Sequence, residues 1–291
     1  MIRERYNRHM RIDTHVHVYP PEVQADWQKI AEREPHFASI CSGKVHKWAL
    51  AEDVVARMET DGIDQSWITG FAFRDPGLCR ICNDYVKDSV KRYPALLKGL
   101  AVVNPMSPGF EKEISRCSEQ GTIGVGELFP DGQVFDIADI RQTWRLVAEC
   151  HSRGLFIMLH TAEPVGREYP GKGRTGPREA AAFCTNHPEV QVVFAHMGGG
   201  LWGYETLKEM KLYLQNAWYD TAAAPYLYFP QVFSSVFAAG AGGKLLYGSD
   251  FPLLGAERYL KMLDDSGLEE DSISMVMGGN AEDLLKRAKK I

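Results

Sequence analysis

The stretch Leu155-Phe156-Ile157-Met158-Leu159-His160 is an uninterrupted apolar run that ends in a histidine. A second run, Val192-Val193-Phe194-Ala195-His196, ends in a histidine 36 residues after the first one. Continuous apolar runs of this length are typical of parallel strands that are covered on both faces. A period of about 36 residues accommodates one strand, one helix and two loops. The two runs therefore predict a β/α repeat with a polar group at the end of each strand.

Similar runs extend this alternation along the whole chain. Strands are expected at 10–15, 65–71, 97–103, 122–128, 154–160, 190–196, 216–221 and 244–249. Amphipathic helical patterns lie between them, at 51–61, 82–93, 109–120, 139–153, 177–187, 201–215, 230–239 and 256–265. Residues 269–289 predict an extra C-terminal helix, broken near Gly278 and Gly279. Eight strands alternating with eight helices predict an α/β fold, a single (β/α)8 TIM barrel, with a doubly wound open sheet as the alternative.

Residues 18–50 belong to none of these β/α units. A long connection after a strand is often a lid over a functional site. We therefore expect 18–50 to form a cap over the carboxyl ends of the strands. The whole chain, 1–291, is then one barrel domain that carries this insertion.

Composition and charge exclude several classes of protein. The chain has 291 residues, with 33 Lys and Arg against 38 Asp and Glu, and a formal net charge of −5. This balance argues against a nucleic-acid partner and against a polybasic membrane contact. No stretch approaches the roughly 18 apolar residues of a membrane span, and the first residues lack the apolar core of a signal peptide. The six scattered cysteines favour buried thiols in a reducing cytoplasm over a disulfide framework.

Polar side chains at the strand ends are the strongest functional signal. Asp13-Thr14-His15-Val16-His17 places alternate residues, including both histidines, on one face of a strand. Four further candidates each end an apolar run: Glu127, His160, His196 and Asp250. In a barrel these ends share one rim, where active sites lie. Because zinc binds two or three histidines and a carboxylate, the pattern predicts a metal site at this rim.

These residues resemble the metal-dependent amidohydrolase superfamily, and most closely its amidohydrolase-2 branch of aminocarboxymuconate-semialdehyde decarboxylase-like enzymes. The resemblance covers nearly the whole chain. Its carriers are the segment 13–17, His160, Ala195-His196-Met197-Gly198-Gly199, Tyr247-Gly248-Ser249-Asp250-Phe251-Pro252 and Gly279-Asn280-Ala281.

The resemblance implies roles for the candidate residues. A divalent ion, usually zinc, would be held by His15, His17, His160 and Asp250, whereas His196 would face the substrate or the attacking water. The role of Glu127 stays open, because it could bridge two ions, bind a single ion or only orient a ligand.

Three functions are compatible with these residues. The favoured one is a metal-dependent hydrolase of a small, carboxylated substrate, an amide, a lactone or a compound with a scissile C–C or C–N bond. In it the ion activates water, Asp250 moves the proton and His196 polarises the carbonyl. The alternative is a metal-dependent decarboxylase of the same branch. A non-catalytic barrel that only binds metal is the third. The expected partner is a small molecule, and homo-oligomerisation is left open.

Loop residues provide candidates for substrate binding. Arg74, Arg167 and Arg174 suit an acidic substrate, and Trp202 is a candidate for the pocket wall. Residues 166–173 resemble a P-loop but lack the hydroxyl residue that binds magnesium, so we expect no nucleotide site there. Asp220, at the end of the seventh expected strand, either supports a ligand or is structural.

Overall fold

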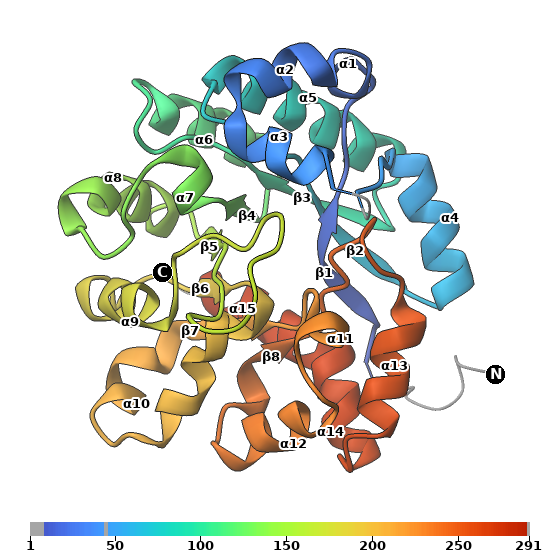
Figure 1. Ribbon diagram of the computed structural model, residues 1–291, viewed down its shortest axis with the longest axis vertical. Helices are drawn as coiled ribbons and strands as arrows, with labels where there is room; N and C mark the ends of the chain where they lie inside the picture. Colours follow the sequence, from blue (N-terminus) through green and yellow to red (C-terminus); the bar gives the residue numbers. More distant parts are fainter. Residues whose placement is uncertain (1–8, 44–45, 290–291) are drawn as a thin grey trace.

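The computed structural model describes residues 9–43 and 46–289 and shows a parallel β barrel (Figure 1). The strands are β1 (Ile12–His17), β2 (Gln65–Thr69), β3 (Leu97–Ala101), β4 (Gly124–Leu128), β5 (Phe156–Leu159), β6 (Val192–Phe194), β7 (Ala217–Asp220) and β8 (Leu245–Leu246). They pair in the order β1 to β8, each parallel to the next. The Thr14 amide donates to the Tyr247 carbonyl at 2.9 Å and joins the last strand to the first. The (β/α)8 barrel expected from the alternation is confirmed.

Helices surround the barrel close to their expected positions. They are α4 (Ala51–Asp61), α5 (Pro76–Arg92), α6 (Phe110–Glu119), α8 (Ile140–His151), α9 (Pro177–Asn186), α12 (Gln231–Ala238) and α13 (Ala256–Asp264). Short helices α7 (Pro130–Gln133) and α11 (Ala224–Leu227) lie in loops at the rim. Helix α5 begins six residues before its expected start, because the Asp75 carboxylate accepts hydrogen bonds from the amides of Gly77 and Leu78.

Two expected helices have a different form. No long helix covers 201–215, where the structure has a 3₁₀ segment (His196–Thr206), α10 (Met210–Tyr213) and a short 3₁₀ turn (Leu214–Asn216). Residues 196–200 all have positive φ angles, so a right-handed helix cannot begin before residue 201. Leu207 then has an extended backbone, with a ψ of 124°, which interrupts the helix expected over 201–215. The last segment is not broken at Gly278, because a π-helical turn (Met275–Gly279) joins α14 (Glu270–Ser274) to α15 (Asn280–Ala288). A Cβ on Gly278 would lie 1.7 Å from the Met10 carbonyl oxygen, so the glycine permits a close helix–chain contact.

The insertion after β1 forms the expected cap. It contains α1 (Pro21–Ala25), α2 (Trp27–Arg33) and α3 (Pro35–Cys41), the blue helices at the top of Figure 1. The buried Glu34 carboxylate accepts hydrogen bonds from the amides of Arg74 and Asp75, which follow β2. The His36 ring lies 3.9 Å from the Phe129 ring, which follows β4. The cap is therefore fixed to loops at the carboxyl end of the barrel.

Apolar side chains fill the lower part of the barrel. Strand residues that include Trp67, Phe156, Met158 and Trp218 form one buried cluster, separate from the larger core between strands and helices. This cluster closes the barrel below the rim, so the polar strand ends face a space that opens at the cap side. Among the described residues, no helix combines the length and apolar character needed to cross a bilayer.

Candidate metal centre

Two irregular strands turn the polar residues of β1 and β4 into the barrel. The β1–β2 register shifts between Asp13 and Val16, and the β4–β5 register shifts between Val125 and Leu128. Each shift adds one residue to the first strand of the pair, which exchanges the inward and outward faces beyond it. Ile12 therefore packs in the lower cluster, whereas His15 and Glu127 face the rim. Asp13 does not join them, because its carboxylate accepts the Ser249 amide at 2.9 Å.

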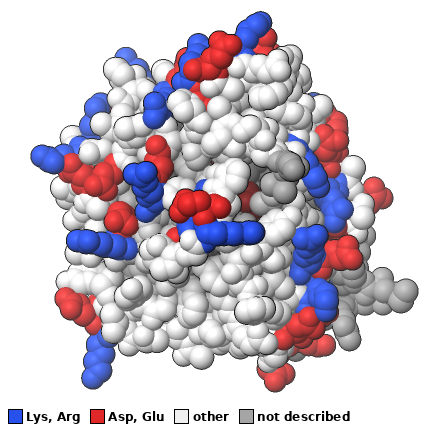
Figure 2. Space-filling model, in the orientation of Figure 1, with Lys and Arg blue, Asp and Glu red and all other residues white. Residues whose placement is uncertain are grey.

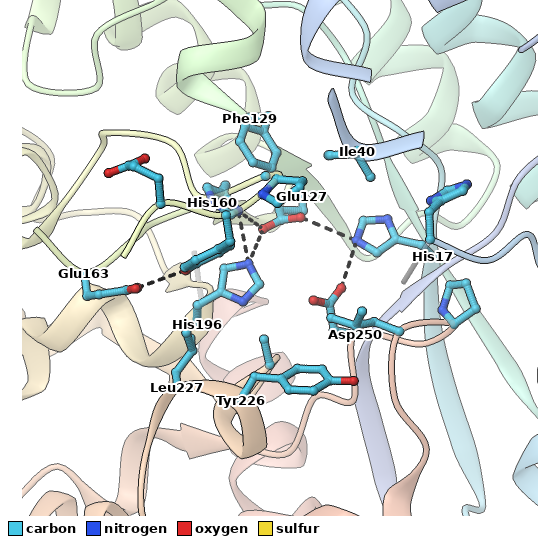
Figure 3. Close-up of a pocket in the computed structure, with 18 of the residues that line it drawn as sticks. His17, Ile40, Glu127, Phe129, His160, Glu163, His196, Tyr226, Leu227 and Asp250 are labelled. Carbon is cyan, nitrogen blue, oxygen red and sulfur yellow. Dashed lines mark hydrogen bonds and ion pairs between the residues drawn. The ribbon is translucent and has the colours of Figure 1, made fainter. Parts of the chain in front are cut away.

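The His15 group consists of His15, His17 and Asp250. Nε2 of His15 and Nε2 of His17 lie 3.1 Å apart. Oδ1 of Asp250 lies 3.9 Å from Nε2 of His15 and 3.6 Å from Nε2 of His17. Figure 3 shows His17 and Asp250 pointing toward each other in the pocket, and the buried His15 lies behind them. Their ligand atoms come from β1 and from the loop after β8, so they bridge the seam of the barrel.

The His160 group consists of Glu127, His160 and His196. Nδ1 of His160 lies 2.9 Å from Oε1 of Glu127 and 3.0 Å from Nε2 of His196. The other carboxylate oxygen of Glu127, Oε2, lies 3.4 Å from Nε2 of both His15 and His17. Glu127 thus stands between the two groups, with one oxygen toward each (Figure 3).

Hydrogen bonds on the outer side set the tautomers of three imidazoles. Nδ1 of His15 faces a carboxylate oxygen of Asp220 at 2.8 Å. Nε2 of His160 faces the Lys172 carbonyl at 3.0 Å, and Nδ1 of His196 faces the Ala222 carbonyl at 3.1 Å. These oxygens can only accept, so each of these ring nitrogens carries the proton. The opposite nitrogen of each neutral ring then turns a lone pair toward the centre, as a metal-binding histidine requires.

The electrostatics of the cluster favour positive charge. Burial lowers the pKa of His196, but the hydrogen bond and charge of Glu127 outweigh it and raise that pKa to about 9. Burial likewise opposes the charged form of His15, yet Glu127 and Asp220 raise its pKa well above the usual value. Burial raises the pKa of Glu127, but the neighbouring His15 and His160 lower it well below the usual range. A buried carboxylate that draws protons onto adjacent imidazoles would also attract a cation.

The spacing of the donors fits a divalent ion. Bonds of about 2.1 Å place neighbouring ligand atoms about 3.0–3.4 Å apart in an octahedral or tetrahedral shell. The separations of 3.1 Å between His15 and His17 and 3.4 Å from each to Glu127 fall in this range. His15, His17 and Asp250 form one group that could hold a divalent metal ion, with the Asp250 oxygen at a longer 3.6–3.9 Å from the two imidazole nitrogens. Glu127, His160 and His196 form a second group, whose ligand atoms lie 2.9–3.4 Å apart.

Two residues at the rim have an unusual backbone conformation. His196 and Asp250 have φ angles of 55° and 58°, in the left-handed region that non-glycine residues seldom adopt. Such conformations persist only where the surrounding structure holds them, and they are concentrated at functional sites. Asp250 is held by its amide, which donates to the His15 carbonyl at 3.0 Å.

A cavity of about 820 Å³ lies above the two groups. Figure 2 shows its mouth as a hollow with charged side chains beside it. Much of its wall is aromatic: Tyr19, Phe71, Phe129, Tyr169, Tyr226 and Tyr228. Two cationic residues, Arg167 and Lys47, also line it. The cavity therefore combines an apolar wall, a polar floor and, near the opening, both positive charge (Arg167, Lys47) and negative charge (Glu163, Glu168).

The structure brings some predicted residues to this cavity but not others. His17, Glu127, His160, His196, Asp250 and Arg167 line it, and buried His15 lies beneath. Arg74, Arg174 and Trp202 are not among its lining residues. The Arg74 side chain turns to the Gly132 carbonyl, and exposed Arg174 follows a turn fixed by Asp131. Trp202 lies beyond the glycines after β6, half-buried, with its indole nitrogen enclosed.

Two residues contribute to the site more than the sequence indicated. Asp220 contacts both groups, because its second oxygen accepts the His196 amide at 2.9 Å. Its position after an apolar run was the available signal. Lys172 supplies a backbone carbonyl to His160, and no sequence pattern indicates such a contact.

Comparisons with known proteins agree with the fold. The sequence matches a family described as Amidohydrolase over residues 12–287. No curated protein matches the sequence. Among solved structures, 5-carboxyvanillate decarboxylase from Novosphingobium aromaticivorans, complexed with manganese and a nitrobenzoic acid, superposes with a TM-score of 0.75 at 15% identity, covering 98% of this chain and 97% of that one.

Two further structures are similar. Dihydroxybenzoic acid decarboxylase from Polaromonas, with bound manganese and 2-nitroresorcinol, has a TM-score of 0.72 at 16% identity and covers 96% of this chain and 97% of its own. 2,6-Dihydroxybenzoate decarboxylase from Rhizobium has a TM-score of 0.69 at 16% identity, with 96% and 99% covered. At these identities the likeness shows the fold alone.

Proposed function

The chain belongs to the amidohydrolase family, and from its site we propose that it is a metal-dependent lyase that removes carbon dioxide from a small aromatic acid. The observation that carries the proposal is the convergence of two ligand groups beneath an aromatic cavity with cationic residues at its opening. The similar structures, decarboxylases that bind manganese and small aromatic ligands, support the same class of reaction. The sequence favoured a hydrolase over a decarboxylase, and this proposal prefers the decarboxylase.

Substrate binding follows from the cavity wall. Aromatic side chains such as Phe129 and Tyr226 offer flat apolar faces to a planar ring. The Arg167 guanidinium can attract an acidic substrate to the opening, which fits its sequence-based role. In this pose the ring would extend from the mouth to the polar floor.

The floor provides the chemistry. A bound divalent ion, manganese or zinc, would act as a Lewis acid that polarises substrate oxygen atoms. Loss of carbon dioxide leaves an electron pair on carbon, which must receive a proton. Asp250 and His196 both line the cavity and are the groups we propose to carry that proton and to hold the substrate oxygens.

Hydrolysis is the second candidate, and the position of Glu127 favours it. A carboxylate with one oxygen toward each of two ligand groups suits a pair of ions that activate water. Asp250 would then accept the proton of that water. The ratio of metal to protein therefore bears on the reaction as well as on the site.

One assay separates these functions. Protein reconstituted with manganese or zinc is incubated with hydroxybenzoic acids, lactones and amides that carry a carboxylate, and both carbon dioxide release and ring or amide opening are measured. Metal-dependent release of carbon dioxide supports the lyase. Opening of a ring or an amide without release of carbon dioxide supports the hydrolase. Full metal loading without turnover of any compound would favour the non-catalytic barrel and reject both.

A further inference from the structure

Residues 163–173, which we term the strap, follow β5 and cross the edge of the cavity. Seven consecutive strap residues, 165–171, line the cavity wall. The strap also meets the cap, because a Cβ on Gly171 would lie 3.5 Å from the Ile40 side chain. A Cβ on Gly43 would lie 3.8 Å from Pro170. The position of the strap therefore decides the shape of the opening.

A buried ammonium group organises the strap from inside. The Lys172 side chain is only 5% exposed, and its Nζ donates to the carbonyls of Val165 at 2.9 Å and Arg167 at 3.1 Å. The Glu163 carboxylate lies 3.7 Å from the same Nζ. Burying an ammonium group is costly unless its donors are satisfied, so these contacts hold the strap in one closed form. Lys172 binds the backbone carbonyl of Arg167, and the Arg167 residue lines the cavity.

The backbone of the same residue reaches the ligand cluster. The Lys172 carbonyl accepts a hydrogen bond from Nε2 of His160 at 3.0 Å. This bond places the His160 proton on Nε2 and leaves Nδ1 free to face Glu127 and His196. One residue thus touches the substrate-facing strap through its side chain and a candidate ligand through its backbone.

We propose that Lys172 is a positioning residue that couples the strap to the His160 group. When a cation fixes His160, the carbonyl of Lys172 is fixed as well, and the ammonium group transmits that order to Val165 and Arg167. Loading of the His160 group therefore orders the wall that receives the substrate. The inference rests on the proposed metal centre, but it does not depend on which reaction that centre catalyses.

Amide hydrogen exchange tests the coupling without any substrate. In the full-length wild-type protein, saturation with Mn²⁺ is expected to slow exchange in 163–173 about tenfold or more relative to chelator-treated protein. In Lys172→Met the strap should exchange rapidly with or without Mn²⁺, and Mn²⁺ affinity should fall about 10–100-fold, as for other groups that orient a ligand. Lys172→Arg, which keeps the charge, should restore part of both effects.

Lys244 provides a matched control. Its ammonium group is partly buried, donating to Glu205 at 2.8 Å and to the Leu214 carbonyl at 2.7 Å, and it does not line the cavity. Lys244→Met should lower stability yet leave strap exchange and Mn²⁺ affinity within about twofold of wild type. Equal behaviour of the two lysine variants would overturn the coupling. The coupling would also be overturned if Mn²⁺ left strap exchange in the wild-type protein unchanged. This measurement does not depend on the folding of any variant.

The substrate assay comes last and separates the two proposals. With a turned-over acid, Lys172→Met should raise KM about tenfold while kcat, measured at saturating Mn²⁺, changes less than threefold. If no acid is turned over but Mn²⁺ still orders the strap in the wild type alone, the coupling stands and the proposed reaction fails. If an acid is turned over and KM is unchanged in Lys172→Met, the coupling fails and the reaction stands.

Discussion

Asp220 accepts a hydrogen bond from Nδ1 of His15 at 2.8 Å, and both side chains are fully buried. The other oxygen of Asp220 accepts the amides of His196 at 2.9 Å and Ala222 at 3.0 Å. All partners of this carboxylate are therefore donors. It fixes the ring of one group and the backbone of the other, so it holds the two groups in a common frame.

Asp220→Asn should lower metal affinity about 10–100-fold. In one orientation the new side-chain NH2 group faces the His196 amide, which is also a donor. In the other orientation it faces Nδ1 of His15, and the imidazole proton must move to Nε2, the nitrogen that faces the metal centre. Affinity is measured by competition with a chelating dye. Asp84→Asn, on an ion pair of α5 away from the cavity, is the control and should bind metal like wild type. Wild-type affinity in Asp220→Asn would contradict the role of this carboxylate.

Glu127→Gln should separate one-ion from two-ion occupancy. If Glu127 bridges, wild type reconstituted without chelator binds about two equivalents and the variant binds about one or fewer, because the amide loses the charge between the groups. Elemental analysis after gel filtration measures the ratio. A wild-type ratio of one, unchanged in the variant, would leave Glu127 outside the metal shell.

Asp250→Asn should reduce turnover about 10²–10⁴-fold with most of the metal retained, because an amide keeps the size of the side chain but cannot carry the proton. His196→Asn should also reduce turnover, and its metal content decides its role. Retained metal assigns His196 to the substrate, and loss of metal assigns it to the His160 group beside Nδ1 of His160. Both variants fully active with metal bound would reject these assignments.

Stability of the metal-free protein should depend on pH through His196. Its pKa is raised to about 9, above the value of about 6.5 expected in the unfolded chain. The stabilisation is fully present below pH 6.5 and is lost as pH rises through 9, a change of about 3 kcal/mol in the free energy of unfolding. Because the same proton competes with a cation, metal affinity should rise over this interval.

Urea unfolding of chelator-treated protein at several pH values tests this dependence. His196→Asn, which lacks this titrating group, should reduce the slope of the profile between pH 6.5 and 9, and His15, whose pKa is also raised, accounts for the slope that remains. A wild-type profile as flat as that of the variant would show that His196 carries no raised pKa.

Gly199→Ala should destabilise the protein and disturb the His196 loop. The new Cβ would lie 2.3 Å from the Ala162 carbonyl oxygen, at a φ of +57°. Gly200→Ala is the matched control, because its φ is also positive but nothing lies within 4 Å of a Cβ there. The control is expected to cost only the backbone strain of about 1–2 kcal/mol. Equal melting temperatures for the two variants would show that the contact with Ala162 is unimportant.

Much of the barrel and its rim follows from local sequence patterns. Apolar runs locate the strands because parallel strands are buried on both faces, and their polar ends identify Glu127, His160, His196 and Asp250. The helix expected at 201–215 was wrong because the backbone is extended at Leu207, and hydrophobic spacing does not report backbone angles. Asp13 was expected beside the histidines, but an added residue in β1 changed the face of the strand.

The pairing of residues within the rim could not be predicted. The family resemblance placed His160 with His15 and His17, yet the structure places its Nδ1 beside Glu127 and His196. Such pairings depend on which carbonyl or carboxylate lies behind each ring, and these partners come from distant loops. The prediction for two arginines was wrong for the same reason, since Arg74 and Arg174 lie in loops at the rim but do not line the cavity.

The seam between β1 and the loop after β8 has a consequence for biosynthesis. Asp250 is translated only after almost all of the barrel that follows His15, and Tyr247 must be present before Thr14 has its partner. A nascent chain therefore carries His15 and His17 without Asp250 while the intervening strands are made. A divalent ion could therefore meet the full donor set only after β8 has been made and the barrel has closed against β1.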